Sequence, residues 1–227
     1  RGLSRSDAMT DPDALDAAER IGVIDLGSNS LRLAVFERLG AASVRVGEGP
    51  GHRRDTYALA DEAGYERIVP DFHRRFIDLN RDDVHPVADC FEKEFFFPAS
   101  VLEADLIVSL AKMKTHHWAG ATLSMKNLFG LVPGSVYGWP KNQLHQFGIT
   151  ESILALNRYF QRKTFAIVDG IIAMDGNGPI QGRPKAANVV VLGRDLVAVD
   201  ATCCRIMDID PLKIGYLANA WWGNCGI

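Results

Sequence analysis

The chain has few cysteines, no long apolar run and almost no net charge, and each shortage excludes a class of protein. Its four cysteines include no Cys-x-x-Cys pair, which argues against a zinc knuckle or an iron–sulfur cluster held by this chain. No apolar run reaches the roughly 18 residues of a membrane helix, and no signal peptide opens the sequence. We therefore expect a soluble, cytoplasmic protein with reduced thiols. A net charge of −3 gives no overall attraction to nucleic acid or to anionic membranes.

The hydrophobic pattern alternates between short apolar runs, typical of buried strands, and amphipathic segments with helical spacing. This alternation predicts an α/β fold with a mostly parallel sheet and helices on both faces, in three layers. We expect strands at 21–26, 43–46, 76–79, 104–110, 165–168 and 188–192, and helices at 56–64, 122–129, 150–160, 196–207 and 211–220.

Polar side chains follow several of these expected strands. In a parallel sheet, ligands bind beyond the carboxyl ends of the strands. We therefore expect the polar residues after the strands to share one ligand-binding mouth; they are Glu48, Asp78, Lys114, Asp169 and Asp195.

The richest motif runs from Lys114-Thr-His116-His117 to Lys126-Asn127, directly after a buried strand. Lysines and histidines are costly to bury without a partner, so their clustering in an apolar stretch favours a cationic pocket for a carboxylate or phosphate. We predict Lys114, Lys126 and Asn127 as ligand binders. His116, His117 and Lys126 are the candidate catalytic residues, with a histidine as proton donor or metal ligand. The alternative is a solvated surface loop.

Four aspartates in the second half of the chain have competing interpretations. Asp169 and Asp175 flank a glycine-rich loop, where they could hold a hard divalent cation, pair with the lysines or simply form turns. Asp200 lies within an apolar helix, and we predict that it contacts the ligand. Asp195, at the start of that helix, fits an ordinary helix cap.

The segment Gly47-Glu48-Gly-Pro-Gly51, followed by Arg53, is similar to a phosphate cradle with a charge clamp. A simple turn is the alternative, because the lysine and serine of a P-loop are missing. Asp78 and Asn80 could add oxygen ligands, or lie in a solvated loop. Glu48, Arg53, Asp78 and Asn80 are therefore further candidate ligand-binding residues.

From about residue 40 onward, the motifs resemble those of the family of domain of unknown function 362. The segments that carry this resemblance are 46–49, 76–80, 114–116, 126–130, 168–170, 176–179 and 195–200. The family is sometimes joined to ferredoxin modules, so the resemblance implies an iron–sulfur protein as a partner. Trp221 and Trp222, if exposed, could support that docking.

Two shorter resemblances concern phosphate and proton chemistry. Residues 21–37 look like the opening hairpin of the exopolyphosphatase and guanosine-pentaphosphatase family, which implies phosphate contacts and phosphohydrolysis through Asp25–Ser30. The spacing from His116 to Lys126 is similar to a stretch of nickel-pincer lactate racemases. That likeness implies an acid/base role for His116 and a cofactor-anchoring role for Lys126.

These observations predict two parts, an atypical N-terminal segment at 1–39 and an α/β domain at 40–227 that we expect to be truncated at its C-terminus. Three functions stay open. The first is binding of a small anionic ligand, with a divalent metal and acid/base catalysis as further options. The second is non-catalytic binding to an iron–sulfur redox protein. The third is hydrolysis of polyphosphate or a nucleotide.

Overall fold

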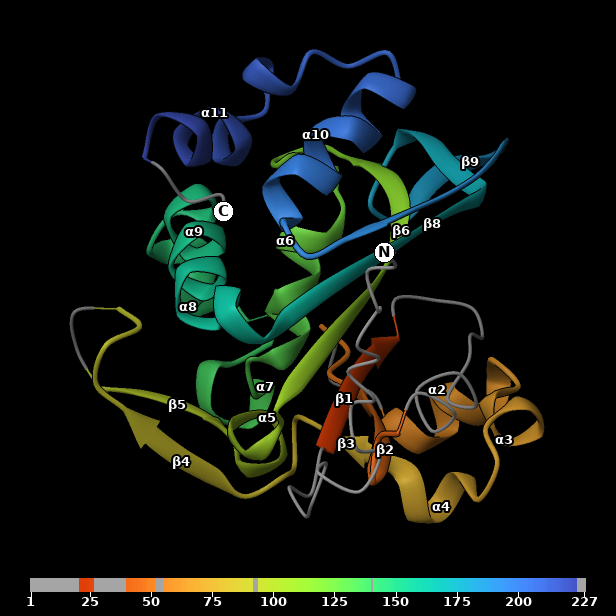
Figure 1. Cartoon of the computed structure of the whole chain (residues 1–227), viewed down its shortest axis with the longest axis vertical. Coiled ribbons are helices and arrows are strands. Elements are labelled where there is room, and N and C mark those ends of the chain that lie inside the picture. Colours follow the sequence, from red (N-terminus) through yellow and green to blue (C-terminus); the bar gives the residue numbers. More distant parts are fainter. Residues whose placement is uncertain (1–20, 27–39, 52–54, 92–93, 140, 224–227) are drawn as a thin grey trace, which may run out of the picture.

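The structure is a computed structural model that describes residues 21–26, 40–51, 55–91, 94–139 and 141–223. Its centre is a twisted sheet with the strand order β3-β2-β1-β6-β8-β9, and a short β7 also pairs with β6 (Figure 1). The strands are β1 (Ile21–Leu26), β2 (Ser43–Glu48), β3 (Phe76–Asp78), β6 (Leu106–His116), β7 (Gly120–Thr122), β8 (Thr164–Asn177) and β9 (Gln181–Gly193). A separate hairpin consists of β4 (Val84–Val87) and β5 (Phe95–Pro98).

The main sheet is mixed, which corrects the predicted mostly parallel sheet in its detail. Strands β3, β2, β1, β6 and β8 pair in parallel, whereas β7 is antiparallel to β6 and β9 is antiparallel to β8. The antiparallel pairs arise because short turns join their strands, and a short turn cannot return the chain in parallel.

Both faces of the sheet are covered, as the alternation of β6 demonstrates. Val108 and Leu110 belong to one apolar cluster, whereas Ile107, Ala111 and Met113 belong to the other. Successive strand residues point to opposite faces, so the two clusters lie on opposite sides of the sheet. The predicted α/β class is therefore confirmed.

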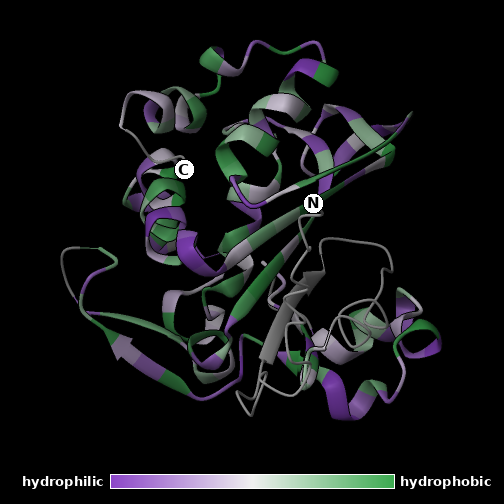
Figure 2. Cartoon of the chain, viewed as in Figure 1, coloured by the Kyte–Doolittle hydropathy of each residue, from purple (hydrophilic) through white to green (hydrophobic). Residues whose placement is uncertain are grey.

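The smaller cluster packs under the helices α2 (Thr56–Glu62), α3 (Tyr65–Ile68) and α4 (Phe72–Arg75). The larger cluster packs under the helical segments that follow β5, and Figure 2 shows them striped with hydrophobic and hydrophilic residues. These helical segments are α5 (Ala99–Glu103), α6 (Ser124–Asn127), η1 (Leu128–Leu131), α7 (Gly134–Tyr137), α8 (Asn142–Gln146), α9 (Ile149–Phe160), η2 (Gln161–Lys163), α10 (Leu196–Ile206), η3 (Pro211–Lys213) and α11 (Gly215–Trp222).

Several strands are longer than the sequence predicts, and β9, expected at 188–192, already begins at Gln181. Strand β6 continues through Lys114 and His116, which we expected in a loop, and β8 continues past Asp169 as far as Asn177. The helix expected at 122–129 is instead the end of β7, one turn of α6 and the 3-10 turn η1. Strands β7 and β9 pair with β6 and β8 beyond the buried core and supply hydrogen-bond partners for their backbones. For this reason both strands continue into polar sequence.

Helix caps were predicted with mixed success. Asp195 caps α10 as expected, since its side chain accepts a hydrogen bond from the backbone N–H of Ala198 at 3.1 Å. The helix expected at 150–160 begins one residue earlier, at Ile149, and follows Gly148 instead of a side-chain cap. Gly148 has a φ of 104°, a conformation that favours glycine.

Cys90, Cys203 and Cys204 are buried free thiols, and burial raises the pKa of each to about 12. They are therefore core residues rather than reactive groups. None of the helices in the described part of the chain is both long enough and apolar enough to cross a membrane.

Candidate functional site

A cavity of about 910 Å³ opens where β2 and β6 end. Its wall consists of the loop Glu48–Gly51, the end of β6 with residues 114 and 116–118, and the hairpin turn 177–181 between β8 and β9. Residues from β7, α6, η1 and α8 complete it. The volume is within the range of small-molecule sites, roughly 300–1,000 Å³.

The alternation of β6 places its lysine and histidine on one face. Lys114 and His116 are two residues apart, so their side chains leave the strand on the same side. Across the ladder, Lys114 is paired with Thr122 and His116 with Gly120. Lys114, His116 and Thr122 all line the cavity.

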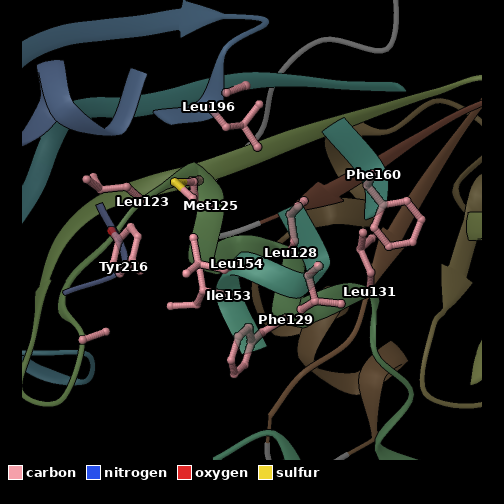
Figure 3. Packing of buried hydrophobic residues seen from close by; sticks show 14 of the residues in the cluster. Leu123, Met125, Leu128, Phe129, Leu131, Ile153, Leu154, Phe160, Leu196 and Tyr216 are labelled. Carbon is pink, nitrogen blue, oxygen red and sulfur yellow. The ribbon is translucent and has the colours of Figure 1, made fainter. Parts of the chain in front are cut away.

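Lys126 reaches the same cavity from α6, a helix fixed by its apolar neighbours. Leu123, Met125 and Leu128 are fully buried and point into the larger cluster (Figure 3). The half-buried Lys126 extends along the ring of Phe129, with its Nζ 4.7 Å from the ring centre. The core packing of its neighbours therefore directs Lys126 into the cavity.

The two lysines share an environment that disfavours their charge. Burial, and then the charge of Lys114, lowers the pKa of Lys126 to about 8. Burial also lowers the pKa of Lys114, while Glu48 acts in the opposite direction. Within the described residues, the ammonium group of neither Lys114 nor Lys126 has a hydrogen bond or an ion pair. Both groups are thus available to an anion.

Lys141 also lines the cavity but already has partners. This residue is 3% exposed, and its Nζ donates to the carbonyl oxygens of Gly49 at 2.9 Å, Phe129 at 2.9 Å and Gly130 at 3.3 Å. It therefore fastens the Glu48–Gly51 loop to η1. A Cβ at Gly49 would lie 2.2 Å from the Gly130 oxygen, so this close approach requires glycine.

The hydrogen bonds of His116 define its tautomer. Its buried Nδ1 lies 3.1 Å from the backbone nitrogens of both Trp118 and Ala119, and each of these N–H groups donates to it. A ring nitrogen that accepts carries no proton, so the neutral ring is protonated at Nε2. Burial, and then the charge of Lys126, lowers the pKa of His116 to about 3. His116 is therefore a neutral hydrogen-bond donor at Nε2, and this tautomer leaves no lone pair there for a metal.

His117 and His145 have the opposite arrangement. The Nδ1 of His117 lies 2.8 Å from the Gly178 carbonyl oxygen, and the Nδ1 of His145 lies 3.1 Å from that of Lys141. A carbonyl oxygen only accepts, so both histidines donate through Nδ1. Their neutral rings carry the lone pair at Nε2. The two adjacent histidines, whose rings stack with centres 5.0 Å apart, therefore offer one donor and one acceptor.

Asn127 and Thr122 add uncharged polar groups to the wall. The Nδ2 of Asn127 donates to Ser109 Oγ at 3.1 Å, which orients the carboxamide. Thr122 is 9% exposed, and its Oγ1 has no hydrogen-bond partner among the described residues. An unpartnered buried hydroxyl beside an open cavity indicates a missing partner.

Asp200 does not line the cavity, contrary to the predicted ligand contact. It is completely buried and accepts hydrogen bonds from the backbone nitrogens of Ser124 and Met125, at 2.8 and 3.0 Å, and from the Ser124 hydroxyl. Burial raises its pKa to about 7, although these hydrogen bonds oppose the shift. Asp200 therefore caps α6 from α10 and positions Lys126 indirectly.

Asp78 and Asn80 also lie behind the wall. The side chain of Asn80 accepts from the Gly134 N–H at 2.8 Å and donates to the Pro50 carbonyl oxygen at 3.2 Å. Asp78 accepts from the backbone N–H of Asn80 and lies 3.6 Å from Arg81. They hold the Glu48–Gly51 loop instead of contacting the cavity.

The structure does not bring Asp169 or Asp175 to the cavity. Asp169 pairs with Lys112 at 2.5 Å, its neighbour across the β6–β8 ladder, and Asp175 lies 4.0 Å from Lys185. The ladder shifts register between Lys112 and Lys114, so that Lys114 faces Met174 instead. Within the described residues, no group of three or more His, Cys, Asp or Glu side chains could hold a metal.

Of the remaining predicted residues, Glu48 lines the cavity. Arg53 and the segment Gly27–Ser30 lie outside the described residues. The backbone of Asp25 is paired with Gly47 and Ser109, next to the end of β2.

Sequence reasoning missed four parts of the wall: Thr122, Lys141, His145 and the turn 177–181. The turn had been noted only as a glycine-rich loop. Its Gly178 accepts from the His117 backbone N–H at 3.1 Å, and a Cβ there would lie 1.9 Å from the Thr115 oxygen. The remaining three carried no local signal, because their roles depend on long-range contacts.

Comparisons with known proteins agree with this geometry only at the level of family. A family model described as Domain of unknown function (DUF362) matches residues 31–205. The chain is also 32% identical over 123 residues to a thylakoid-associated protein of Synechocystis sp.. That alignment covers 52% of this chain and 37% of the relative, well under half of the relative's length.

Proposed function

Because this chain belongs to the family described as Domain of unknown function (DUF362), and the matched region includes every lysine and histidine of the cavity, we propose that it binds a small anionic ligand there. Lys114 and Lys126 bind the negative group. His116 donates from Nε2, and His117 exchanges a proton at its Nε2. The ligand is a carboxylate or a phosphate.

One observation carries the proposal: two half-buried lysines line a cavity, and their ammonium groups have neither a hydrogen bond nor an ion pair among the described residues. Burial of an unpaired charge is costly, and a bound anion offsets that cost. The charge of the lining supports the same conclusion, since three lysines and only one carboxylate, that of Glu48, line the cavity. Thr122 supplies a hydroxyl that also lacks a partner.

The test is direct titration with carboxylates and phosphates, measured by calorimetry on the wild type and on single variants. Lys114→Ala and Lys126→Ala should each weaken binding, because each removes one charge from the cavity. Lys185→Ala is the matched control, since Lys185 is exposed and lies outside the cavity wall. Equal affinities in all four proteins would refute the proposal.

A second candidate is docking onto an iron–sulfur redox protein, the partner that the family resemblance implies. It is favoured by the exposure of Trp221 and Trp222, at 69% and 80%. The thylakoid association in the name of the relative is compatible with a redox setting. Co-purification of a protein containing iron and sulfide, lost in Trp221→Ala/Trp222→Ala but kept in Lys114→Ala, would favour this candidate over the first.

A further inference from the structure

Lys126 differs from the other lysines of the cavity in its contacts. Lys141 has all its donors occupied by carbonyl oxygens, and Lys114 lies near the carboxylate of Glu48. Lys126 instead lies against the Phe129 ring, with Lys114 as its main charged neighbour. Such an apolar site beside a second cation favours the uncharged amine, which is a nucleophile.

The groups around Lys126 suit a carbonyl compound. His116 presents a neutral Nε2–H donor, which can polarise a carbonyl oxygen without giving up its proton. His117 presents an Nε2 lone pair that can accept a proton. Lys114, whose charge the nearby Glu48 favours, lines the same cavity and can bind an anionic group at the other end of the ligand. An inert anion could use the two lysines and the His116 donor, but it has no use for the His117 acceptor.

We propose that Lys126 forms an imine with the ligand, and that the ligand is therefore a small carboxylate or phosphate carrying an aldehyde or ketone group. This inference rests on the proposed function, since the anionic group must first bind at Lys114. It assigns separate roles to the two lysines of the motif.

The reaction needs no oxidant or reductant. The Nζ lone pair of Lys126 attacks the carbonyl carbon, and His116 donates a hydrogen bond to the developing oxyanion. The amine loses a proton to His117, which returns it to the oxygen. The carbon–oxygen bond then breaks, water leaves with both amine hydrogens, and a carbon–nitrogen double bond remains. Protonation of that imine makes the carbon bonded to it electrophilic.

Reductive trapping tests this step on the whole chain. The protein is incubated with pyruvate or with glycolaldehyde phosphate, reduced with cyanoborohydride, and mapped by peptide mass spectrometry. We expect an adduct at Lys126, and the more reactive probe identifies carboxylate or phosphate as the anchored group. At pH 8, where the pKa of Lys126 leaves about half of it uncharged, modification should be faster at Lys126 than at the exposed Lys185.

Lys126→Arg is the matched variant, because it keeps the positive charge but cannot form an imine. It should lose the adduct, whereas Lys185→Arg, which changes an exposed lysine outside the cavity wall, should keep the adduct at Lys126. If the wild type binds pyruvate and lactate but has no excess adduct at Lys126, the imine is refuted and anion binding stands. If neither probe nor lactate binds, the proposed function fails as well. The wild-type peptide map decides the question even if the variant does not fold.

Discussion

Charged residues occur in two contrasting settings on either side of α6. On the cavity side, Lys114 and Lys126 have no hydrogen bond and no ion pair in the described part of the chain. Behind the wall, Asp200 accepts three hydrogen bonds from Ser124 and Met125. Asp169 likewise pairs with Lys112. Residues of the same types are therefore structural where they are paired and available to a ligand where they are not.

The two settings depend on each other. Asp200 holds the start of α6, and α6 carries Lys126 into the cavity. Removal of a paired group behind the wall should therefore reduce the stability of the fold. Removal of a lysine on the cavity side should instead reduce the affinity for the anion. Variants that separate these effects test the comparison.

The largest effect is expected for Asp200→Ala. The substitution leaves two buried backbone N–H groups without an acceptor, each worth about 1–3 kcal/mol. We expect the free energy of unfolding to fall by about 3 kcal/mol in denaturant titrations. Asp200→Asn keeps one acceptor oxygen and should lose less. A wild-type unfolding curve for Asp200→Ala would mean that the cap contributes nothing.

The second largest effect is expected for Lys114→Ala and Lys126→Ala, which should weaken the affinity for an anion. A hydrogen bond to a charged group contributes about 1.5–3 kcal/mol, so each variant should weaken anion affinity about 10- to 100-fold. Lys112→Ala removes a lysine of the same strand that is already paired with Asp169, and should leave affinity unchanged. An equal loss in Lys112→Ala would indicate a diffuse charge effect instead of a defined site.

Much of the cavity could be predicted because many of its residues lie close together in the sequence. Lys114, His116, His117, Lys126 and Asn127 all line it, and all of them come soon after the apolar run 104–110 that marks the strand. Strand position and hydrophobic pattern are local properties, so the sequence alone reveals them.

The errors concern properties that depend on distant contacts. Asp169 misses the cavity because the β6–β8 ladder shifts register after Lys112, and no local pattern marks that irregularity. Asp200 stood out correctly as an unusual buried acid, but its partners lie 75 and 76 positions away in the sequence. Lys141 was missed because its three carbonyl acceptors come from two other segments.

The third prediction uses pH to separate the two settings. Burial raises the pKa of Asp200 to about 7, so the folded protein holds its proton longer than the unfolded chain does. Stability should fall as pH rises from about 4 to 7. Burial lowers the pKa of Lys126 to about 8, so stability should rise between about pH 8 and 10.

Anion affinity should change in the opposite direction over that alkaline range. Deprotonation of Lys126 removes a charge from the cavity, so binding should weaken as pH rises through about 8. Denaturation at several pH values checks the two stability slopes, and calorimetry over the same range checks affinity. Asp200→Asn should abolish only the fall in stability between about pH 4 and 7. Lys126→Met should abolish only the changes in stability and in anion affinity above about pH 8. Any other pattern would mean that different groups titrate.

The smallest effect is expected for Thr122→Val, which replaces a buried hydroxyl with a methyl group of similar size. Without ligand the hydroxyl has no partner among the described residues, so its removal should leave stability unchanged or raise it by up to about 1 kcal/mol. With an anion bound, the variant should lose a hydrogen bond and bind a few-fold more weakly. Thr115→Val is the control, because the Thr115 hydroxyl already donates to the Gly176 carbonyl oxygen at 2.8 Å. Its removal should therefore reduce stability even without ligand. If Thr122→Val were as destabilising as Thr115→Val in the ligand-free protein, the Thr122 hydroxyl would belong to the paired setting and not to the cavity.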